Sequence, residues 1–236
     1  MHKAIQGHPE SPRLWAILIT KIITNLGFRP CKHEPCLYFN PDYKGNPVYF
    51  LRQVDDFAIG ALHENIEHEI ISKIDDHMTI KVKSLGIIDR FNGVDIEQTR
   101  FYTKLHNCTY IKKIIENKLF KDTHSQFSPL PMSEDKDYNK MIESSIPLDE
   151  KELNKCEKEF NFTYRQGIGE LIYAMVTCRP DISFPLIKLS QYSSAPSRAH
   201  FTAVQGIFNY LRQTLNEGIY YWRKSHAQTC LLASVP

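Results

Sequence analysis

The spacing of apolar residues predicts two helices near the start of the chain. Between residues 12 and 26, apolar side chains recur three and four positions apart, with Ser11 as a candidate cap, Pro12 in the first turn and Gly27 at the end. Between residues 64 and 76, isoleucines recur at helical spacing with charged residues between them. We expect the first helix to be buried and the second to cover one face of a sheet.

Short apolar runs between these helices predict strands. Two runs, at residues 36–39 and 48–51, are separated by residues that favour turns. The second run continues into Asp55 and Asp56, and residues 57–61 resume the apolar pattern directly after them. Two carboxylates therefore interrupt a hairpin whose strands are otherwise apolar.

A further pair of strands is predicted at residues 91–96 and 101–105. Asn107 follows them as a candidate cap for a helix that continues through residue 118. The first half of the chain therefore has an α+β pattern.

The second half of the chain has a mostly helical pattern. Acidic residues and prolines are frequent between about 120 and 150, where we expect a mobile acidic linker. Beyond residue 162, apolar spacing predicts helices at about residues 168–175, 182–192 and 201–215.

Composition restricts the class of protein without indicating a partner. The chain has 236 residues, 42% of them hydrophobic, which excludes a disulfide-dependent miniprotein and a wholly disordered chain. The net charge is +2, and the six cysteines are interpreted as reduced intracellular thiols. No signal-peptide pattern opens the chain and no apolar run reaches the about 20 residues of a membrane span, so we expect no export and no membrane partner.

Asp55 and Asp56 are the first candidates for chemistry. Ionised carboxylates seldom lie between apolar strands unless they are paired or bound to a metal ion. A tight turn, in which both side chains accept backbone hydrogen bonds, is the simpler interpretation. Two adjacent acids repel each other, however, and carboxylate oxygens suit Mg²⁺ that also binds a substrate phosphate. A pair of such ions would activate a 3′-hydroxyl and stabilise departing pyrophosphate, which is the chemistry of nucleotidyl transfer.

Five segments of the chain, in order, match the motifs of one known family. Residues 50–60 contain Val-Asp-Asp followed by apolar residues, where the family has Tyr-Val-Asp-Asp. Residues 6–15 end in Ser-Pro-Arg-Leu-Trp, as does the family segment that opens a helix. The other matches lie at residues 27–37, 84–96 and 164–182. The sequence therefore resembles the reverse transcriptases of copia-type retrotransposons, from residue 3 to about residue 222.

The resemblance implies roles for individual residues. Asp55 would be a metal ligand and Asp56 a weaker second carboxylate, with Mg²⁺ as the cofactor or Mn²⁺ in its place. Gly7 would let the backbone approach the incoming nucleotide, and Gln6 occupies a position that could contact it. A primer grip, which holds the primer terminus against the metals, would be formed by residues 91–96, including Phe91, Asn92 and Gly93.

Departures from the family pattern lower the expected activity. Gln53 stands where the family has Tyr, which puts a primer-side contact in doubt. Pro9 and Glu10 stand where the family has Lys and Gln, so a cationic phosphate contact is absent there. The family's first catalytic Asp and its fingers belong to a segment before the one with which this sequence begins. We therefore expect this polypeptide alone to have little or no polymerase activity.

Lysines surround the helix that is predicted after the primer grip. Such a basic face could contact template–primer phosphates, and a solvated helix face explains the same pattern equally well. The lysines are Lys104, Lys112, Lys113, Lys118 and Lys121.

Three other signals are interpreted as structural or are discounted. Cys31, His33 and Cys36 lack a second ligand pair at zinc-finger spacing, so we expect no zinc site. The Arg-Pro-Asp segment at residues 179–181 is expected to join two helices, with the proline starting the second one. Aromatic residues at 220–222 are expected to form a terminal strand, with stacking on bases as the alternative.

Together, these patterns predict an α+β fold in which a partial polymerase palm precedes a helical thumb or connection region. The palm would span about residues 1–106, the thumb 107–224 and a tail 225–236. The complete enzyme would extend a primer with deoxynucleotides on an RNA or DNA template, beside the fingers and ribonuclease H of the Pol polyprotein. The family resemblance implies an intracellular location, in a cytoplasmic particle or the nucleus. The alternatives are a non-catalytic nucleic-acid-binding remnant and a decayed reading frame whose product does not fold stably.

Overall fold

A computed structural model of the chain describes residues 8–78, 81–116, 130–223 and 229–234. The chain folds into two compact units. The first unit consists of Met1–Asn92, Gln98–Thr103 and Trp222–Pro236, and the second of Gly93–Glu97 and Lys104–Tyr221. Each unit has a hydrophobic core of its own. Whether the units correspond to a palm and a thumb, divided near residue 106, stays a prediction.

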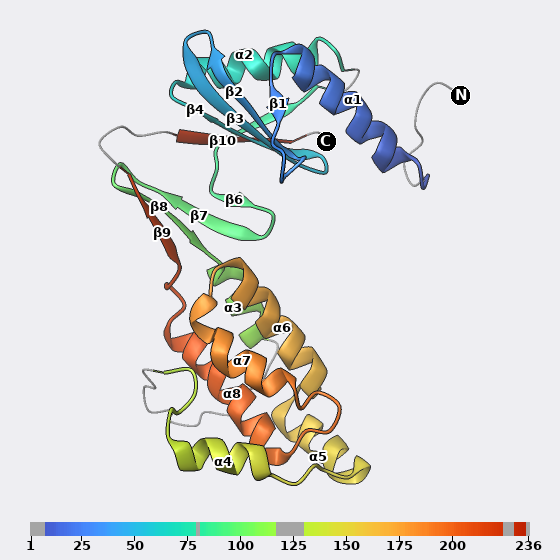
Figure 1. Cartoon of the computed structure of the whole chain (residues 1–236), viewed down its shortest axis with the longest axis vertical. Coiled ribbons are helices and arrows are strands. Elements are labelled where there is room, and N and C mark those ends of the chain that lie inside the picture. Colours follow the sequence, from blue (N-terminus) through green and yellow to red (C-terminus); the bar gives the residue numbers. More distant parts are fainter. Residues whose placement is uncertain (1–7, 79–80, 117–129, 224–228, 235–236) are drawn as a thin grey trace. The chain divides into compact units, whose positions relative to one another are not determined.

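The first unit is built on an antiparallel sheet with the strand order β1-β2-β3-β4-β10-β5. Helices α1 (Ser11–Asn25) and α2 (Glu64–Asp75) contribute isoleucines to the same core as the apolar side chains of the central strands, so both helices cover one face of the sheet (Figure 1). The strands are β1 (Arg29–Pro30), β2 (Leu37–Tyr43), β3 (Asn46–Gln53), β4 (Asp56–Ala61), β5 (Lys83–Ile87) and β10 (Thr229–Ser234).

The predicted helices and the first hairpins are confirmed, and several details differ. Helix α1 begins after Glu10, and no side chain caps it, so the expected cap at Ser11 was wrong. Gly27 ends the helix with a φ of 87°, as its lack of a side chain allows. The outer face of α1 is not buried, because Leu14, Ile17 and Leu18 are about half exposed.

The expected C-terminal tail contains a strand. Residues 229–234, which include the apolar run Cys-Leu-Leu-Ala, form β10 between β4 and β5. The expectation of a tail at residues 225–236 was therefore wrong for this part, because backbone pairing with strands distant in sequence decides the structure there.

A second sheet has the strand order β6-β7-β8-β9. Asn92 and Gly93 form the turn between β6 (Arg90–Phe91) and β7 (Val94–Gln98), with φ values of 49° and 80°. Two successive positive φ angles are typical of the tight turn that an Asn-Gly pair favours. The remaining strands are β8 (Tyr102–His106) and β9 (Ile219–Trp222), so the terminal strand predicted from the aromatic residues is confirmed.

The second unit is mostly helical, as predicted. Its core includes apolar side chains of α3, α5, α6, α7 and α8, with Ile142 of α4 completely buried among them. The helices are α3 (Cys108–Glu116), α4 (Lys136–Ser144), α5 (Glu150–Phe160), α6 (Tyr164–Thr177), the short 3₁₀ helix η1 (Pro180–Ile182), α7 (Ser183–Ser190) and α8 (Arg198–Gln213). None of the helices in the described ranges is long and apolar enough to cross a membrane.

The acidic stretch that was expected as a linker is helical in part. Asp135 caps α4 by accepting hydrogen bonds from the backbone of Asp137 and Tyr138, and Asp149 caps α5 in the same way through Glu152. The acids therefore begin helices here, and one buried isoleucine attaches α4 to the core. Residues 120–129 of the expected linker lie outside the described residues.

Asn107 does not cap α3, contrary to expectation. Its side-chain nitrogen donates hydrogen bonds to Ala174 O and Thr177 Oγ1. The carboxylate of Asp95 takes the capping role instead, because it accepts hydrogen bonds from both the backbone N–H and the hydroxyl of Thr109.

The junction predicted at residues 179–181 is confirmed. Pro180 starts η1, and Arg179 is 1% exposed. The guanidinium of Arg179 binds the carboxylate of Asp181 and donates to the backbone oxygen and the hydroxyl of Thr214 at the end of α8. This network joins η1 to α8.

Candidate catalytic hairpin and pocket

Asp55 and Asp56 lie at the tip of the β3–β4 hairpin. Gln53 pairs with Asp56, so the loop between the strands consists of Val54 and Asp55 alone. A two-residue loop that matches the twist of its strands needs a positive φ at its first residue. Val54 meets this requirement with a φ of 54°, which is strained for a β-branched residue.

Trp15 of α1 holds this tip in place. Its indole N–H donates a hydrogen bond to Val54 O at 2.8 Å. Its ring is stacked on Phe57 with a centroid separation of 6.4 Å and an angle of 18° between the planes. The hairpin loop is therefore attached to the helix by a polar contact and an aromatic one.

The two aspartates do not share an environment. Phe57 is buried in the core of the first unit, and its neighbour Asp56 is exposed at the start of β4. Successive residues of a strand point to opposite faces, so Asp56 lies on the face away from the core. Asp55, although exposed, lines a pocket against α1, and Asp56 is not among the residues that line it.

This cavity, here named the hairpin pocket, has a volume of about 670 Å³. One wall comes from the start of α1 and includes Trp15, and the opposite wall comes from the hairpin between Arg52 and Asp55. Cys36, just before β2, also contributes to it. The alternative interpretation was a tight turn in which both side chains accept backbone hydrogen bonds. The loop is a tight turn, and Asp55 in addition lines the hairpin pocket.

The donors at the hairpin tip suit a hard divalent cation. Mg²⁺ is commonly bound by one or two carboxylates together with water and substrate phosphate. Asp55 and Asp56 supply such carboxylates on consecutive residues. Within the described ranges, no group of three or more His, Cys, Asp or Glu side chains is placed to hold a metal ion by itself.

The expected primer grip is a hairpin turn. Phe91 ends β6, and Asn92 and Gly93 form the turn into β7. A Cβ atom at Gly93 would lie 2.5 Å from the hydroxyl oxygen of Tyr173, so any other residue would require the Tyr173 side chain to shift, and the φ of 80° also favours glycine. Gln6 and Gly7, the expected nucleotide contacts, lie outside the described residues.

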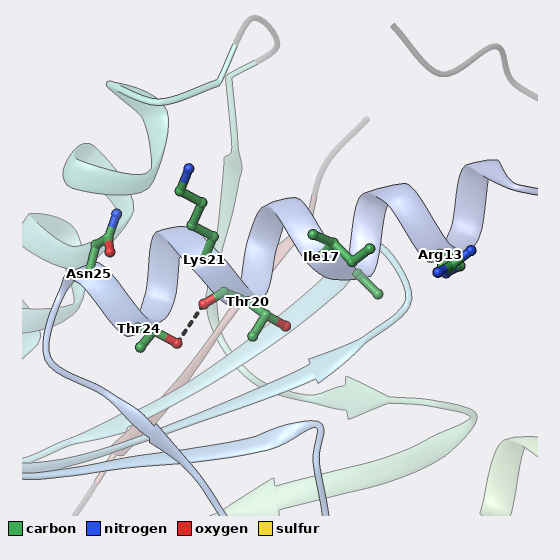
Figure 2. A pocket seen from close by; sticks show the side chains of 7 residues that line it. Arg13, Ile17, Thr20, Lys21, Thr24 and Asn25 are labelled. Atoms are coloured by element: carbon green, nitrogen blue, oxygen red, sulfur yellow. Dashed lines mark hydrogen bonds between the residues drawn. The ribbon is translucent and has the colours of Figure 1, made fainter. Parts of the chain in front are cut away.

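A second depression follows the outer face of α1. Figure 2 shows its lining side chains, all of which belong to this one helix. Thr24 Oγ1 donates to Thr20 O within the helix, and Ile17 is 55% exposed. A hollow that is lined by a single helix has no opposing wall, and it is not a second candidate site.

Comparison with known proteins identifies the family to which these features belong. Residues 1–132 match the family model described as reverse transcriptase (RNA-dependent DNA polymerase). The chain belongs to the reverse transcriptase family. The match includes both the hairpin with Asp55 and Asp56 and the turn at Asn92 and Gly93.

Relatives of the chain include polyproteins of plant transposons. It is 26% identical over 219 residues to the retrovirus-related Pol polyprotein from transposon TNT 1-94 of Nicotiana tabacum, covering 92% of this chain and 16% of the relative. It is 24% identical over 220 residues to the Pol polyprotein from transposon RE1 of Arabidopsis thaliana, covering 93% of this chain and 14% of the relative. The resemblance to copia-type reverse transcriptases is confirmed. No solved structure matches the chain.

The lysines expected at nucleic-acid phosphates have different environments in this reverse transcriptase sequence. Lys104 is only 7% exposed, with Nζ 3.9 Å from Glu97 Oε2 and 5.3 Å from the ring centroid of Tyr220. It therefore does not contribute to an exposed basic face. Lys112 and Lys113 are exposed on α3, while Lys118 and Lys121 lie outside the described residues.

Sequence reasoning assigned no role to Arg52 or Trp15, which form opposite walls of the hairpin pocket. A signal for Arg52 was present, since it is a charged residue directly after the apolar run at 48–51 and close to the acidic pair. Trp15 ends the Ser-Pro-Arg-Leu-Trp segment that matches the family, but this match did not predict its contact with Val54, because an aromatic residue in an amphipathic helix usually belongs to the core.

Proposed function

We propose that this chain supplies the catalytic hairpin of an RNA-directed DNA polymerase that adds deoxynucleotides to a primer 3′ end. The observation that carries the proposal is the position of Asp55, which lines the hairpin pocket at the end of a loop tied to α1 through Trp15. A loop held in this way keeps the backbone of Asp55 in place before substrate binds, which supports catalysis by a pre-positioned charge.

Asp55 and Asp56 would hold Mg²⁺, or Mn²⁺ in its place. Divalent ions in such a site activate the primer hydroxyl and stabilise the departing pyrophosphate. The two carboxylates would bind the metal ion and orient it. Asp55, on the pocket side, would be the stronger metal ligand, and Asp56, on the outer side, the weaker one.

The partners of this function would be a template–primer duplex and deoxynucleoside triphosphates. The turn at Asn92 and Gly93 would hold the primer terminus, supported by its fixed hairpin geometry. Lys112 and Lys113 would contact phosphates, supported by their exposure on α3. The family relatives named as Pol polyproteins support the remaining polyprotein domains as partners.

We further propose that this polypeptide has little polymerase activity by itself. The hairpin provides two carboxylates, and the described residues show no third acidic, histidine or cysteine ligand gathered with them. A nucleic-acid-binding role without catalysis is the second candidate function, and the exposed pair Lys112 and Lys113 favours it.

A chimera tests this proposal. The chain would replace the matching segment of the tobacco TNT 1-94 Pol polyprotein, and primer extension would be compared for the chimera and for the chain alone. We expect extension by the chimera only, and its loss on Asp55→Asn. The matched control is Asp89→Asn, which removes an exposed aspartate outside the hairpin and should retain activity. Extension that persists in the Asp55→Asn chimera would reject the catalytic role.

A further inference from the structure

The guanidinium of Arg52 is directed to the covered face of the sheet. Arg52 on β3 pairs directly with Phe57 on β4. Directly opposed residues of an antiparallel pair have their side chains on the same face, and Phe57 is completely buried on the face that α1 and α2 cover. Arg52 therefore brings a permanent positive charge to the edge of an apolar core, where it lines the hairpin pocket.

The contacts of this guanidinium leave it incompletely satisfied. Nη2 donates to Cys36 Sγ at 3.3 Å, and a thiol is a weak acceptor. Nε is buried and has no hydrogen-bond partner. Within the described part of the chain, Arg52 has no salt bridge to a carboxylate. Nε is too enclosed for a pocket ligand to reach it, but the guanidinium has further N–H donors without a partner among the described residues. Since Arg52 lines the pocket, these donors can bind an acceptor there.

The rest of the hairpin pocket limits the chemistry of that acceptor. Arg52 and Asp55 line the same cavity, so its wall carries one positive and one negative charge. Trp15 adds an aromatic surface to the wall. A ligand that satisfies all three presents an anion to Arg52, a cation to Asp55 and apolar area to the indole. A metal-bound phosphate on a nucleoside has these properties, because the guanidinium fork matches phosphate oxygens and the metal ion matches the carboxylate.

We propose that Arg52 binds a phosphate group of a nucleotide or of a nucleic-acid backbone in the hairpin pocket. The identity of the phosphate carrier rests on the proposed function, whereas the anion site itself rests on the unpaired guanidinium. Arg52 is then a binding residue that fixes the phosphate relative to Asp55. The charge of Asp55 opposes anion binding when no divalent ion is present and supports it when one is.

The fluorescence of Trp15 reports on ligand binding in the hairpin pocket. The chain has two tryptophans, so Trp222→Phe leaves Trp15 as the only one. In this background, the emission would be titrated with thymidine, dTTP, a phosphodiester oligo-dT and a methylphosphonate oligo-dT of the same length, with and without Mg²⁺. Thymidine and the methylphosphonate strand lack the charged phosphate and should bind weakly in every variant.

The decisive comparison is between Arg52→Gln and the matched control Arg29→Gln, which changes an exposed arginine outside the pocket. We expect Arg52→Gln to weaken binding of the phosphate ligand by about tenfold or more, because a hydrogen bond to a charged group is lost. Arg52→Lys should keep part of the affinity, since it keeps the charge and loses the fork. Arg29→Gln should leave the affinity unchanged. Circular dichroism melts of all variants show whether each remains folded.

Each outcome decides one point. If Arg52→Gln binds only dTTP more weakly than the parent protein does, the site binds the free nucleotide. If it binds the phosphodiester strand more weakly, the site binds the nucleic-acid backbone. Equal affinity of folded Arg52→Gln, Arg52→Lys and parent proteins for both ligands overturns the inference. The proposed function fails separately, if the Asp55→Asn chimera still extends primers. In that case a loss of phosphate affinity in Arg52→Gln would leave a phosphate site without polymerase chemistry.

Discussion

The indole N–H of Trp15 donates a hydrogen bond to the carbonyl oxygen of Val54, 39 positions away in sequence, at 2.8 Å. This bond joins the start of a helix to the loop that carries Asp55, and it explains how a two-residue loop at the surface keeps a defined conformation. The hairpin tip of this reverse transcriptase sequence is therefore positioned by the helix as well as by its own strands.

Replacing Trp15 by phenylalanine separates the polar contact from the aromatic one. Trp15→Phe keeps a ring to stack on Phe57 and loses the hydrogen bond to Val54. We expect the free energy of unfolding to fall by about 1 kcal/mol, as for a typical hydrogen bond. Urea denaturation followed by circular dichroism measures this change. Trp222→Phe, at an exposed site, is the control and should change little; equal losses for the two variants would contradict the role of the bond.

Glycine at position 54 should relieve strain. Val54 has a φ of 54° and is 63% exposed, so Val54→Gly removes an unfavourable conformation and little packing. We expect the unfolding free energy to rise by about 1 kcal/mol, the lower end of the cost of such strain. The control Val176→Gly changes an exposed valine inside helix α6 and should lower stability instead. A melting temperature that falls for Val54→Gly would show that the loop is not strained.

Glu67 should make stability depend on pH. Its side chain is 1% exposed on α2, and burial, with a smaller contribution from the charge of Glu64, raises the pKa of Glu67 to about 8. Because the folded pKa lies above the unfolded one, the group's contribution is complete below about pH 4.5 and is lost as pH rises through about 8. The parent protein should therefore lose stability over this window relative to Glu67→Gln.

Urea denaturation at about pH 5 and about pH 8 measures this difference. Glu64→Gln is the matched control on the same helix, and it should leave most of the pH dependence in place because burial is the larger cause. Parallel pH profiles for the parent and Glu67→Gln would contradict the assignment.

The junction at Arg179 should be sensitive to substitution. Arg179→Gln leaves the carboxylate of Asp181 without its guanidinium partner and removes the bonds to Thr214. Asp181 is exposed, so the expected cost comes mainly from the lost hydrogen bonds of the buried guanidinium and is about 2 kcal/mol. Arg165→Gln, an exposed arginine on α6, serves as the control and should cost far less. Thermal melts that agree for both variants would show that the network adds no stability.

Exposed lysines on α3 should determine part of the salt dependence of nucleic-acid binding. The double change Lys112→Gln and Lys113→Gln should weaken binding of a primer–template duplex and reduce the slope of log K against log salt by about 2. Lys104→Gln should not change that slope, because Lys104 is buried beside Glu97. Fluorescence anisotropy at several salt concentrations, with Lys151→Gln and Lys155→Gln on α5 as the control, measures the effect. Identical slopes for the two double variants would remove α3 from the interface.

The local pattern of apolar residues was sufficient to predict the helices and strands that carry the candidate site. Helical spacing predicted α1 and α2, and the apolar runs around Asp55 and Asp56 predicted the β3–β4 hairpin. These elements were predictable because their burial follows from periodicity along a single segment. The Asn-Gly pair at positions 92 and 93 likewise belongs to a tight turn that short-range chemistry specifies.

Features that depend on distant segments could not be predicted in the same way. The acidic residues before α4 and α5 are typical of a linker, because the helices that they cap have few apolar residues. Strand β10 exists through its pairing with β4 and β5, and the burial of Lys104 depends on Tyr220, more than a hundred residues away. The pocket between Trp15 and Arg52 has walls from segments that only the fold brings together.

Asp55 is proposed to hold a divalent ion in the hairpin pocket, and paramagnetic broadening by Mn²⁺ detects such an ion next to Trp15. In the Trp222→Phe background, the indole N–H resonance of Trp15 would be recorded during titration with Mn²⁺ in the presence of dTTP. We expect strong broadening in the parent protein, loss of broadening in Asp55→Asn, and broadening as strong as in the parent protein in Asp89→Asn. Equal broadening in the parent protein and in Asp55→Asn would contradict this proposal.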